Sequence, residues 1–253
     1  RLPSEDDIAQ TLFDTGQTPD PDAIHAALES LRDAMSEGLE DKLQALFVQM
    51  QVPGAYTPDA ISAGKRALAN GALTLLSRRD GGALAQEQFA TADNMTLQLG
   101  ALSSLLLVGA GADELSAFQQ QWQADRLVMD KWFGLQTSLA RPDIAATVAS
   151  ELTRHPDFDW RNPNRFRAVI GGLATNPAGF HNPSGAAYAL VADWIMRIDE
   201  KNPQAAARMS TVFETWRRYD ADRQDLMRGA LRRIANKDGL SRDMTEMVER
   251  ILG

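Results

Sequence analysis

Apolar residues recur at helical spacing along most of the chain. Three segments show this most clearly, with steps of three or four residues between Val128, Trp132, Leu135 and Leu139, between Phe166, Val169, Ile170 and Leu173, and, after Pro203, between Ala205, Met209, Val212, Phe213 and Trp216. This period places the apolar side chains on one face of an α-helix. Alternating runs joined by a hairpin turn are absent from the sequence, because Asp80-Gly81 and Asp238-Gly239 lie between helical segments. The pattern therefore predicts an all-α protein.

Capping residues mark where several of these helices begin. Candidate N-caps precede helical segments at Ser4, Asp59 and Asp93-Asn94. Asn162-Pro163 and Asn202-Pro203 each join an Asn side chain that can accept from a backbone N–H to a proline at the first helical position, where the missing N–H costs nothing. Two further pairs, Asn176-Pro177 and Asn182-Pro183, are interpreted as the ends of a loop between two helices.

The spacing of these signals indicates repeated helix pairs. Asn162 and Asn202 are 40 positions apart, and between them lie one helix, the proline-bracketed loop and a second helix over residues 185–199. Another helix follows Asn202, and after a break at residues 219–220 comes a fourth over residues 221–234. Two helices in about 40 residues is the length of a HEAT or armadillo unit. We therefore predict a single all-α domain over residues 1–253, a superhelix of stacked antiparallel helix hairpins (a HEAT/armadillo-like α-solenoid), with residues 14–22 as its most flexible segment.

Composition excludes several classes of partner and of chemistry. The formal net charge of -8 repels phosphate backbones, so nucleic acid is not expected as a partner. The chain has no Cys, which removes thiolate zinc ligands and Cys nucleophiles and fits a reducing, cytoplasmic compartment. The longest apolar stretch, from Met95, is interrupted by Gln98 and two serines and is shorter than the roughly 20 residues of a membrane span, so it predicts a buried helix and no membrane insertion.

Motifs for self-contained catalysis are missing. None of the histidines, His25, His155 and His181, lies in an H-E-x-x-H or at helical spacing from another, so no metal site is expected in this chain. The glycines at 109 and 111 follow a helix and predict a helix stop. His181 is read as a loop histidine satisfied by backbone groups, and Tyr188 as a packing residue.

Arginines supply the candidate binding chemistry. Gln204 and Arg208 are four residues apart and share one face near a helix N-terminus, and Arg165 and Arg167 occupy a similar position after Asn162-Pro163. Such sites favour anions, for example a peptide carboxylate, although surface ion pairing is the simpler interpretation of the pattern alone. The Arg-rich segment 216–234 is interpreted as a solvated, ion-paired face, with Glu214 before Arg217 and Arg218, and Asp225 before Arg228.

An ordered series of segments resembles a known family. The segments are "YTPDAISAGKRALAN", "FATADNMTLQLGALSSL", "LVMDKWFGLQ", "NPNRFRAVIGG", "NPAGFH", "NPQAAARM" and "YDADRQDLMRGAL". In this order they are similar to the C-terminal helical domain of the bacterial aminopeptidases N, which are gluzincin zinc metallopeptidases. The resemblance covers essentially the whole chain and is tightest over residues 89–231. Since the chain does not begin with Met, we expect a piece of a longer protein.

The resemblance implies a role without catalysis. In this family the zinc ligands and the G-A-M-E-N substrate motif lie in a catalytic domain, and neither motif occurs in this chain. The helical domain closes over that catalytic domain and limits access of peptides to a chamber. The resemblance therefore implies no catalytic or metal-binding residue and no cofactor here, zinc in the catalytic domain of the same polypeptide, peptide substrates, and a monomer.

The resemblance also singles out residues. The "NPQ…R" segment of the family faces the chamber, which points to Gln204 and Arg208, and Arg165 and Arg167 match the arginines of its "NPNR-R" segment. The family's D-G-S-G-Y departs here to Ser184, Gly185, Ala186, Ala187 and Tyr188, so an Asp and a Ser are lost.

A free-standing α-solenoid that binds a protein or peptide on its concave face is the alternative. An upstream reading frame that contains H-E-x-x-H and G-A-M-E-N would decide for the enzyme domain.

Overall fold

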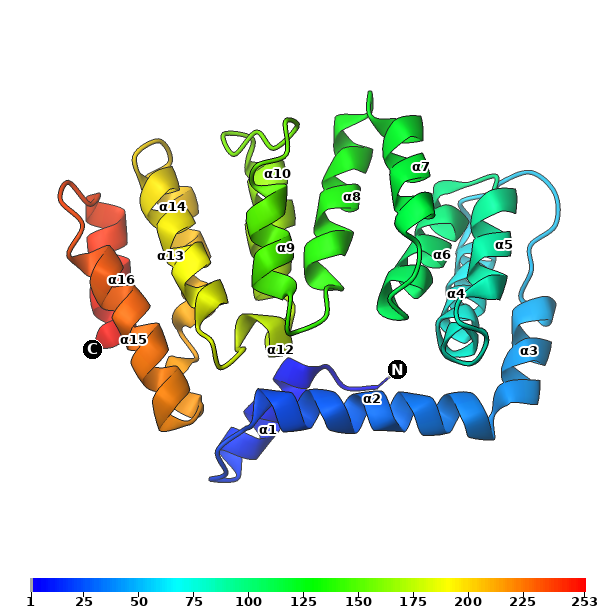
Figure 1. Cartoon of the computed structure of the whole chain (residues 1–253), viewed down its shortest axis with the longest axis horizontal. Coiled ribbons are helices and arrows are strands. Elements are labelled where there is room, and N and C mark those ends of the chain that lie inside the picture. Colours follow the sequence, from blue (N-terminus) through cyan, green and yellow to red (C-terminus); the bar gives the residue numbers. More distant parts are fainter. Residues whose placement is uncertain (1) are drawn as a thin grey trace. The chain divides into compact units, whose positions relative to one another are not determined.

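The computed structural model describes residues 2–253, which contain α-helices, short 3-10 and π-helical turns and no β-strand (Figure 1). The all-α prediction is confirmed. The chain divides into two compact units, unit 1 with Arg1–Ala26 and Phe133–Gly253, and unit 2 with Ala27–Trp132. Helices α2 (Pro21–Gly38) and α8 (Arg126–Ser138) cross the boundaries between the two.

Unit 2 is a stack of helices around a small apolar core. Beside its parts of α2 and α8 it contains α3 (Glu40–Gln49), α4 (Ala60–Asp80), α5 (Ala83–Thr91), α6 (Met95–Leu107) and α7 (Ala112–Trp122). Helix α4 packs against α3, α5 and α6, and connections of two to four residues join α4 to α5, α5 to α6 and α6 to α7. Leu73, Ala85, Ala101 and Leu105 are fully buried where α4, α5 and α6 meet.

The apolar stretch from Met95 forms α6 in this core, as predicted. The predicted end of this helix at the glycines is confirmed. Gly109 and Gly111, between α6 and α7, have φ values of 73° and 84°, in the left-handed region that glycine adopts easily. None of the helices described over residues 2–253 has both the length and the apolar character needed to cross a membrane.

Unit 1 holds the remaining helices and is centred on α13. Its α-helical segments are α1 (Glu5–Asp14), α9 (Ala145–Leu152), α10 (Pro163–Phe166), α11 (Gly172–Ala174), α12 (Pro177–Phe180), α13 (Ala186–Asp199), α14 (Pro203–Ser210), α15 (Ala221–Ala235) and α16 (Arg242–Leu252). Helix α13 packs against α9, α14 and α15, and both α14 and α15 pack against α16. An aromatic cluster of Phe180, Tyr188 and Phe213 is fully buried beside α13, with the rings of Phe180 and Tyr188 5.1 Å apart.

The predicted helix starts are confirmed by their side-chain hydrogen bonds. Ser4 forms a capping box with Asp7, and the side chains of Asp59 and Asn94 accept backbone N–H groups of α4 and α6. Asn162 Oδ1 accepts the N–H of Asn164 at 3.1 Å, and Asn202 Oδ1 accepts that of Ala205 at 3.1 Å. Each cap satisfies an N–H that the first helical turn leaves without a partner.

Two predictions along the chain need correction. Asn176-Pro177 does not open a loop but starts the short helix α12, because Asn176 Oδ1 accepts the N–H of Gly179 at 3.0 Å. The helix after Asn202 does not run on to Trp216, since α14 ends at Ser210 and two 3-10 turns, η2 (Thr211–Phe213) and η3 (Trp216–Arg218), follow. The hydroxyls of Ser210 and Thr211 donate to carbonyls three residues earlier, which competes with a regular helix at this point.

Candidate functional site

The pocket that contains two of the four candidate residues lies between two helical segments of unit 1. One wall is formed by α10 and η1 (Arg167–Gly171), a π-helical segment, and the other by α14 and η2. Its volume is about 310 Å³, and it is lined by Pro163, Phe166, Arg167, Gly171, Ala174, Thr175, Ile198, Ala205, Arg208, Met209, Thr211 and Val212. Apolar walls of this kind suit the side chains of a ligand, while the few polar groups orient it.

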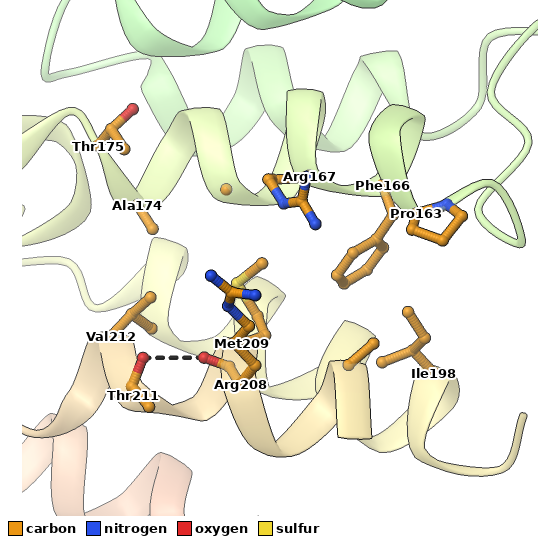
Figure 2. A pocket seen from close by; sticks show the side chains of 12 residues that line it. Pro163, Phe166, Arg167, Ala174, Thr175, Ile198, Arg208, Met209, Thr211 and Val212 are labelled. Carbon is orange, nitrogen blue, oxygen red and sulfur yellow. Dashed lines mark hydrogen bonds between the residues drawn. The ribbon is translucent and has the colours of Figure 1, made fainter. Parts of the chain in front are cut away.

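Two arginines supply the polar groups of this pocket. Arg167 comes from η1 and Arg208 from α14, and Figure 2 shows their guanidinium groups facing each other across the space between the two segments. Both side chains are exposed. Within residues 2–253 neither guanidinium makes a hydrogen bond or an ion pair. Two uncommitted guanidiniums that face one cavity can hold a carboxylate with several charge-assisted hydrogen bonds.

Local sequence explains how the two arginines are placed. Asn202 and Pro203 start α14, which sets Arg208 near its end, where the Thr211 hydroxyl donates to the Arg208 carbonyl at 2.8 Å (Figure 2). Gly171 lies beside Arg167, because a Cβ built there would stand 3.0 Å from Arg167 Cγ. The glycine therefore leaves room for the stem of the arginine. A π-helical turn shifts the following residues around the axis, which is a common device at functional sites.

The other two predicted residues lie elsewhere. Gln204 is exposed on α14 and is not among the residues that line the pocket. Arg165 is buried, with 5% of its surface exposed, and donates through Nη1 to the Asp157 carbonyl at 2.5 Å. Its guanidinium carbon also lies 4.5 Å from the centroid of the Phe133 ring. The structure thus brings Arg167 and Arg208 together, and it places Arg165 among packing contacts.

His181 and Tyr188 form a second, fully buried polar pair. His181 Nδ1 lies 2.7 Å from Tyr188 Oη, so the ring is satisfied by a phenol rather than by the backbone groups expected from the sequence. Burial, together with the positive charges of Arg218 and Arg223, lowers the pKa of His181 to about 3. Burial also raises the pKa of Tyr188 above its usual value. Both groups are therefore neutral near pH 7 and act in packing.

The Arg-rich segment is partly buried, which corrects the prediction of a solvated face. Arg218 is 5% exposed and donates to Asp6, and Arg223 is 8% exposed and donates to Asp22 Oδ2 at 2.5 Å. Glu214 pairs with Arg250 and not with the two arginines that follow it. The predicted pair of Asp225 and Arg228 is confirmed.

Sequence reasoning missed the contacts of Arg218 and Arg223 because their acidic partners belong to the N-terminal helices α1 and α2. The only indication of these contacts in the sequence is the excess of acidic residues near the N-terminus, which could pair with arginines elsewhere in the chain. Together the two arginines fasten this N-terminal segment to the end of unit 1.

Nothing in the described chain fits a bound metal. Over residues 2–253, no group of three or more His, Asp or Glu side chains lies close enough to hold an ion. The residues present therefore do not fit a zinc site, and no step of metal-assisted hydrolysis is derived from this chain.

The loop that departs from the family pattern keeps a local structure. The Ser184 N–H donates to Asn182 Oδ1 at 3.1 Å, and Gly185, with φ of 66°, precedes α13. Ala187 is buried at 1% exposure, whereas Ala186 lines a shallow surface pocket between α9 and α13. Ala187 therefore belongs to the packing of α13 and Ala186 to its surface.

Comparisons with known proteins agree with this architecture. A family model described as "Domain of unknown function (DUF3458_C) ARM repeats" matches residues 1–253. The predicted α-solenoid class is confirmed by this ARM-repeat description.

Several relatives are aminopeptidases. The chain is 40% identical to aminopeptidase N of Caulobacter vibrioides, over 100% of the chain and 29% of the relative, and 33% identical to aminopeptidase N of Escherichia coli, over 99% and 29%. A crystal structure of Legionella pneumophila aminopeptidase A in complex with aspartic acid is similar with a TM-score of 0.88 and 28% identity, over 100% of this chain and 30% of that chain. The chain therefore spans less than a third of the length of these relatives, and the resemblance to the C-terminal domain of aminopeptidase N is confirmed.

Proposed function

Since the chain belongs to the DUF3458_C family of ARM-repeat domains, we propose that it serves as the non-catalytic helical domain of a zinc-dependent aminopeptidase that removes N-terminal residues from peptides. In this role it covers the active-site chamber and controls which substrates enter. The relatives support the proposal, since three of them are aminopeptidases N that this chain matches over 99–100% of its own length.

The pocket of Arg167 and Arg208 is the observation that carries the proposal. An aminopeptidase that acts on the N-terminal end of a peptide leaves the rest of the substrate, including its C-terminal carboxylate, to be held by other surfaces. Two guanidiniums without an acidic partner of their own can take that carboxylate, and the apolar walls of Phe166, Met209 and Val212 can take nearby side chains. Binding energy gained away from the scissile bond then favours peptides over single residues.

The remaining parts of the proposal concern the longer polypeptide. The catalytic domain of the same polypeptide would supply the zinc and the general base, because the side chains that the structure describes form no group that could hold the ion. The protein would act as a monomer in the cytoplasm on peptide substrates, without nucleic acid or membrane partners. Gln204 would extend the same wall of the chamber, one helical turn from Arg208.

Peptide binding by the 253-residue chain tests the proposal. Tetra-alanine with a free carboxylate should bind about tenfold more tightly than its C-terminal amide, because the amide carries no charge for the two arginines. Arg208→Ala should abolish that difference, and Arg232→Ala, which removes an exposed arginine of α15 that forms no ion pair with residues 2–253, should keep it. Equal binding of acid and amide would contradict the proposed pocket.

A second assay separates the domain from an enzyme. The chain alone should not hydrolyse an alanine chromogenic substrate with added zinc, and robust metal-dependent turnover would defeat the proposal. A chain that binds folded proteins but no peptides would favour the free-standing scaffold instead.

A further inference from the structure

A tryptophan and two arginines form an exposed shelf beside the pocket. The guanidinium carbons of Arg161 and Arg197 each lie 5.0 Å from the centroid of the half-buried Trp160 ring, so they are at most twice that distance apart. Arg197 also lies 4.8 Å from the Trp194 centroid. We call Trp160, Arg161 and Arg197 the Arg–Trp shelf.

Neither shelf arginine forms an ion pair with a carboxylate of residues 2–253, although Glu200, whose pKa is lowered first by its hydrogen bond with Lys237, also feels the charge of Arg197. In the part of the chain that the structure describes, neither guanidinium makes a hydrogen bond or ion pair. Asp159 accepts the backbone N–H of Arg161 at 3.1 Å. The acids near Arg197 also have donors, because Asp199 accepts from Ser241, Asp193 from Arg233 and Glu200 from Lys237 at 3.0 Å. In a chain with a net charge of -8, two neighbouring arginines that form no ion pair with the described residues create a local positive region that attracts carboxylates.

The geometry leaves the donors of the shelf available. A guanidinium that lies over an aromatic ring uses its flat face for the contact, whereas its N–H groups point outward in the plane and can still donate. Contacts with two indole rings restrict Arg197 to few rotamers, so less side-chain entropy is lost when a ligand binds.

The shelf is continuous with the pocket through an aromatic bridge. Phe166 lines the pocket, and its ring centroid lies 6.4 Å from that of Trp194, which in turn lies 6.5 Å from that of Trp160. Ile198, the next residue after Arg197, also lines the pocket. The centroids of Phe166 and Trp160 are thus at most about 12.9 Å apart, and two residues of an extended peptide, at about 3.3 Å each, together with a Glu side chain span most of that distance.

We propose that the Arg–Trp shelf binds an acidic side chain of a peptide whose C-terminal carboxylate occupies the pocket of Arg167 and Arg208. The proposal rests on the proposed function and adds a preference for acidic peptides. Selectivity comes from Arg161 and Arg197, which give a carboxylate charge-assisted hydrogen bonds that a neutral amide does not receive.

Calorimetry with two matched peptides tests the shelf. Ala-Ala-Glu-Ala-Ala should bind the 253-residue chain about fivefold more tightly than Ala-Ala-Gln-Ala-Ala at about 20 mM salt, and the preference should vanish at about 0.5 M salt. Arg197→Gln combined with Arg161→Gln should remove the preference and leave the Gln peptide unaffected. Arg197→Lys should retain part of it, because Lys keeps the charge but not the planar fork. Arg232→Gln, which removes the same charge elsewhere, should change nothing.

The outcomes distinguish the two proposals. Equal binding of the Glu and Gln peptides, with both lost in Arg208→Ala, would overturn the shelf and uphold the pocket. Absence of binding by either peptide would overturn the pocket and the shelf together. In a third outcome, the Glu and Gln peptides bind equally and the shelf variants destabilise the longer enzyme. Arg161 and Arg197 would then pair with acidic residues elsewhere in that polypeptide, and the proposal would again be overturned.

Discussion

His181 Nδ1 and Tyr188 Oη lie 2.7 Å apart in the core of unit 1, where both side chains are at least 95% buried. The His181 carbonyl accepts from Arg223 Nε at 2.7 Å, so one residue links α12, α13 and α15. An imidazole in such a place is a structural group whose protonation state matters for stability.

Acid should therefore weaken the fold through His181. The folded pKa is lowered to about 3, whereas an unfolded histidine titrates near 6.5, so the unfolded chain takes up a proton that the folded chain does not. The contribution of His181 is fully present above about pH 6.5 and is lost as the pH falls toward 3, at up to about 1.4 kcal/mol per pH unit. Between pH 7 and pH 5, the free energy of unfolding measured in urea should fall by on the order of 1–2 kcal/mol more in the unsubstituted chain than in His181→Gln. Parallel pH profiles would contradict this role.

Removal of Arg223 should release the N-terminal helices. Its side chain donates to Asp22 of α2 and to Asp220 Oδ2, the latter at 2.7 Å, so Arg223→Ala leaves two carboxylates and the His181 carbonyl without their donor. We expect a loss of about 2–3 kcal/mol in the free energy of unfolding. Hydrogen exchange should also speed up over residues 5–26. Arg232→Ala is the matched control. If residues 5–26 exchange their amide hydrogens no faster in Arg223→Ala, Arg223 does not hold the N-terminal helices in place.

Two glycine substitutions should have opposite effects. A Cβ at Gly172 would stand 2.2 Å from Thr137 Oγ1, which donates to the Ala168 carbonyl at 3.1 Å, so Gly172→Ala should cost about 1–3 kcal/mol through overpacking. Gly229 lies on the exposed face of α15 with nothing near its would-be Cβ, so Gly229→Ala should stabilise by about 0.5–1 kcal/mol. Thermal unfolding measures both. A neutral or stabilising Gly172→Ala would show that α11 and α8 are not closely packed.

Local features of the fold could be predicted from the sequence, and distant pairings could not. The caps at Asn162 and Asn202 follow from residues within three positions, and they were predicted correctly. Arg223 reaches Asp22 across 201 positions, which helical periodicity does not encode. The π-helical segment at Arg167 was also missed, since the apolar residues across it, Phe166, Val169, Ile170 and Leu173, keep the steps of three and four residues of an ordinary α-helix.

In the candidate site, too, the residues could be predicted from the sequence but not how they come together in space. Arg167 and Arg208 were each identified from the sequence, but only the packing of η1 near α14 shows that they share one pocket. The sequence did not distinguish Arg165 from Arg167, which both follow Asn162-Pro163. Burial separates Arg165, at 5% exposure, from the exposed Arg167 and Arg208.

Steady-state kinetics of the longer aminopeptidase that we propose test the central claim, that this chain holds the substrate at a distance from the scissile bond. Arg208→Ala should raise KM for tetra-alanine about tenfold and change KM for a single-residue alanine chromogenic substrate less than about twofold, because only the longer substrate can reach the pocket. Equal changes in KM for the two substrates would contradict the claim.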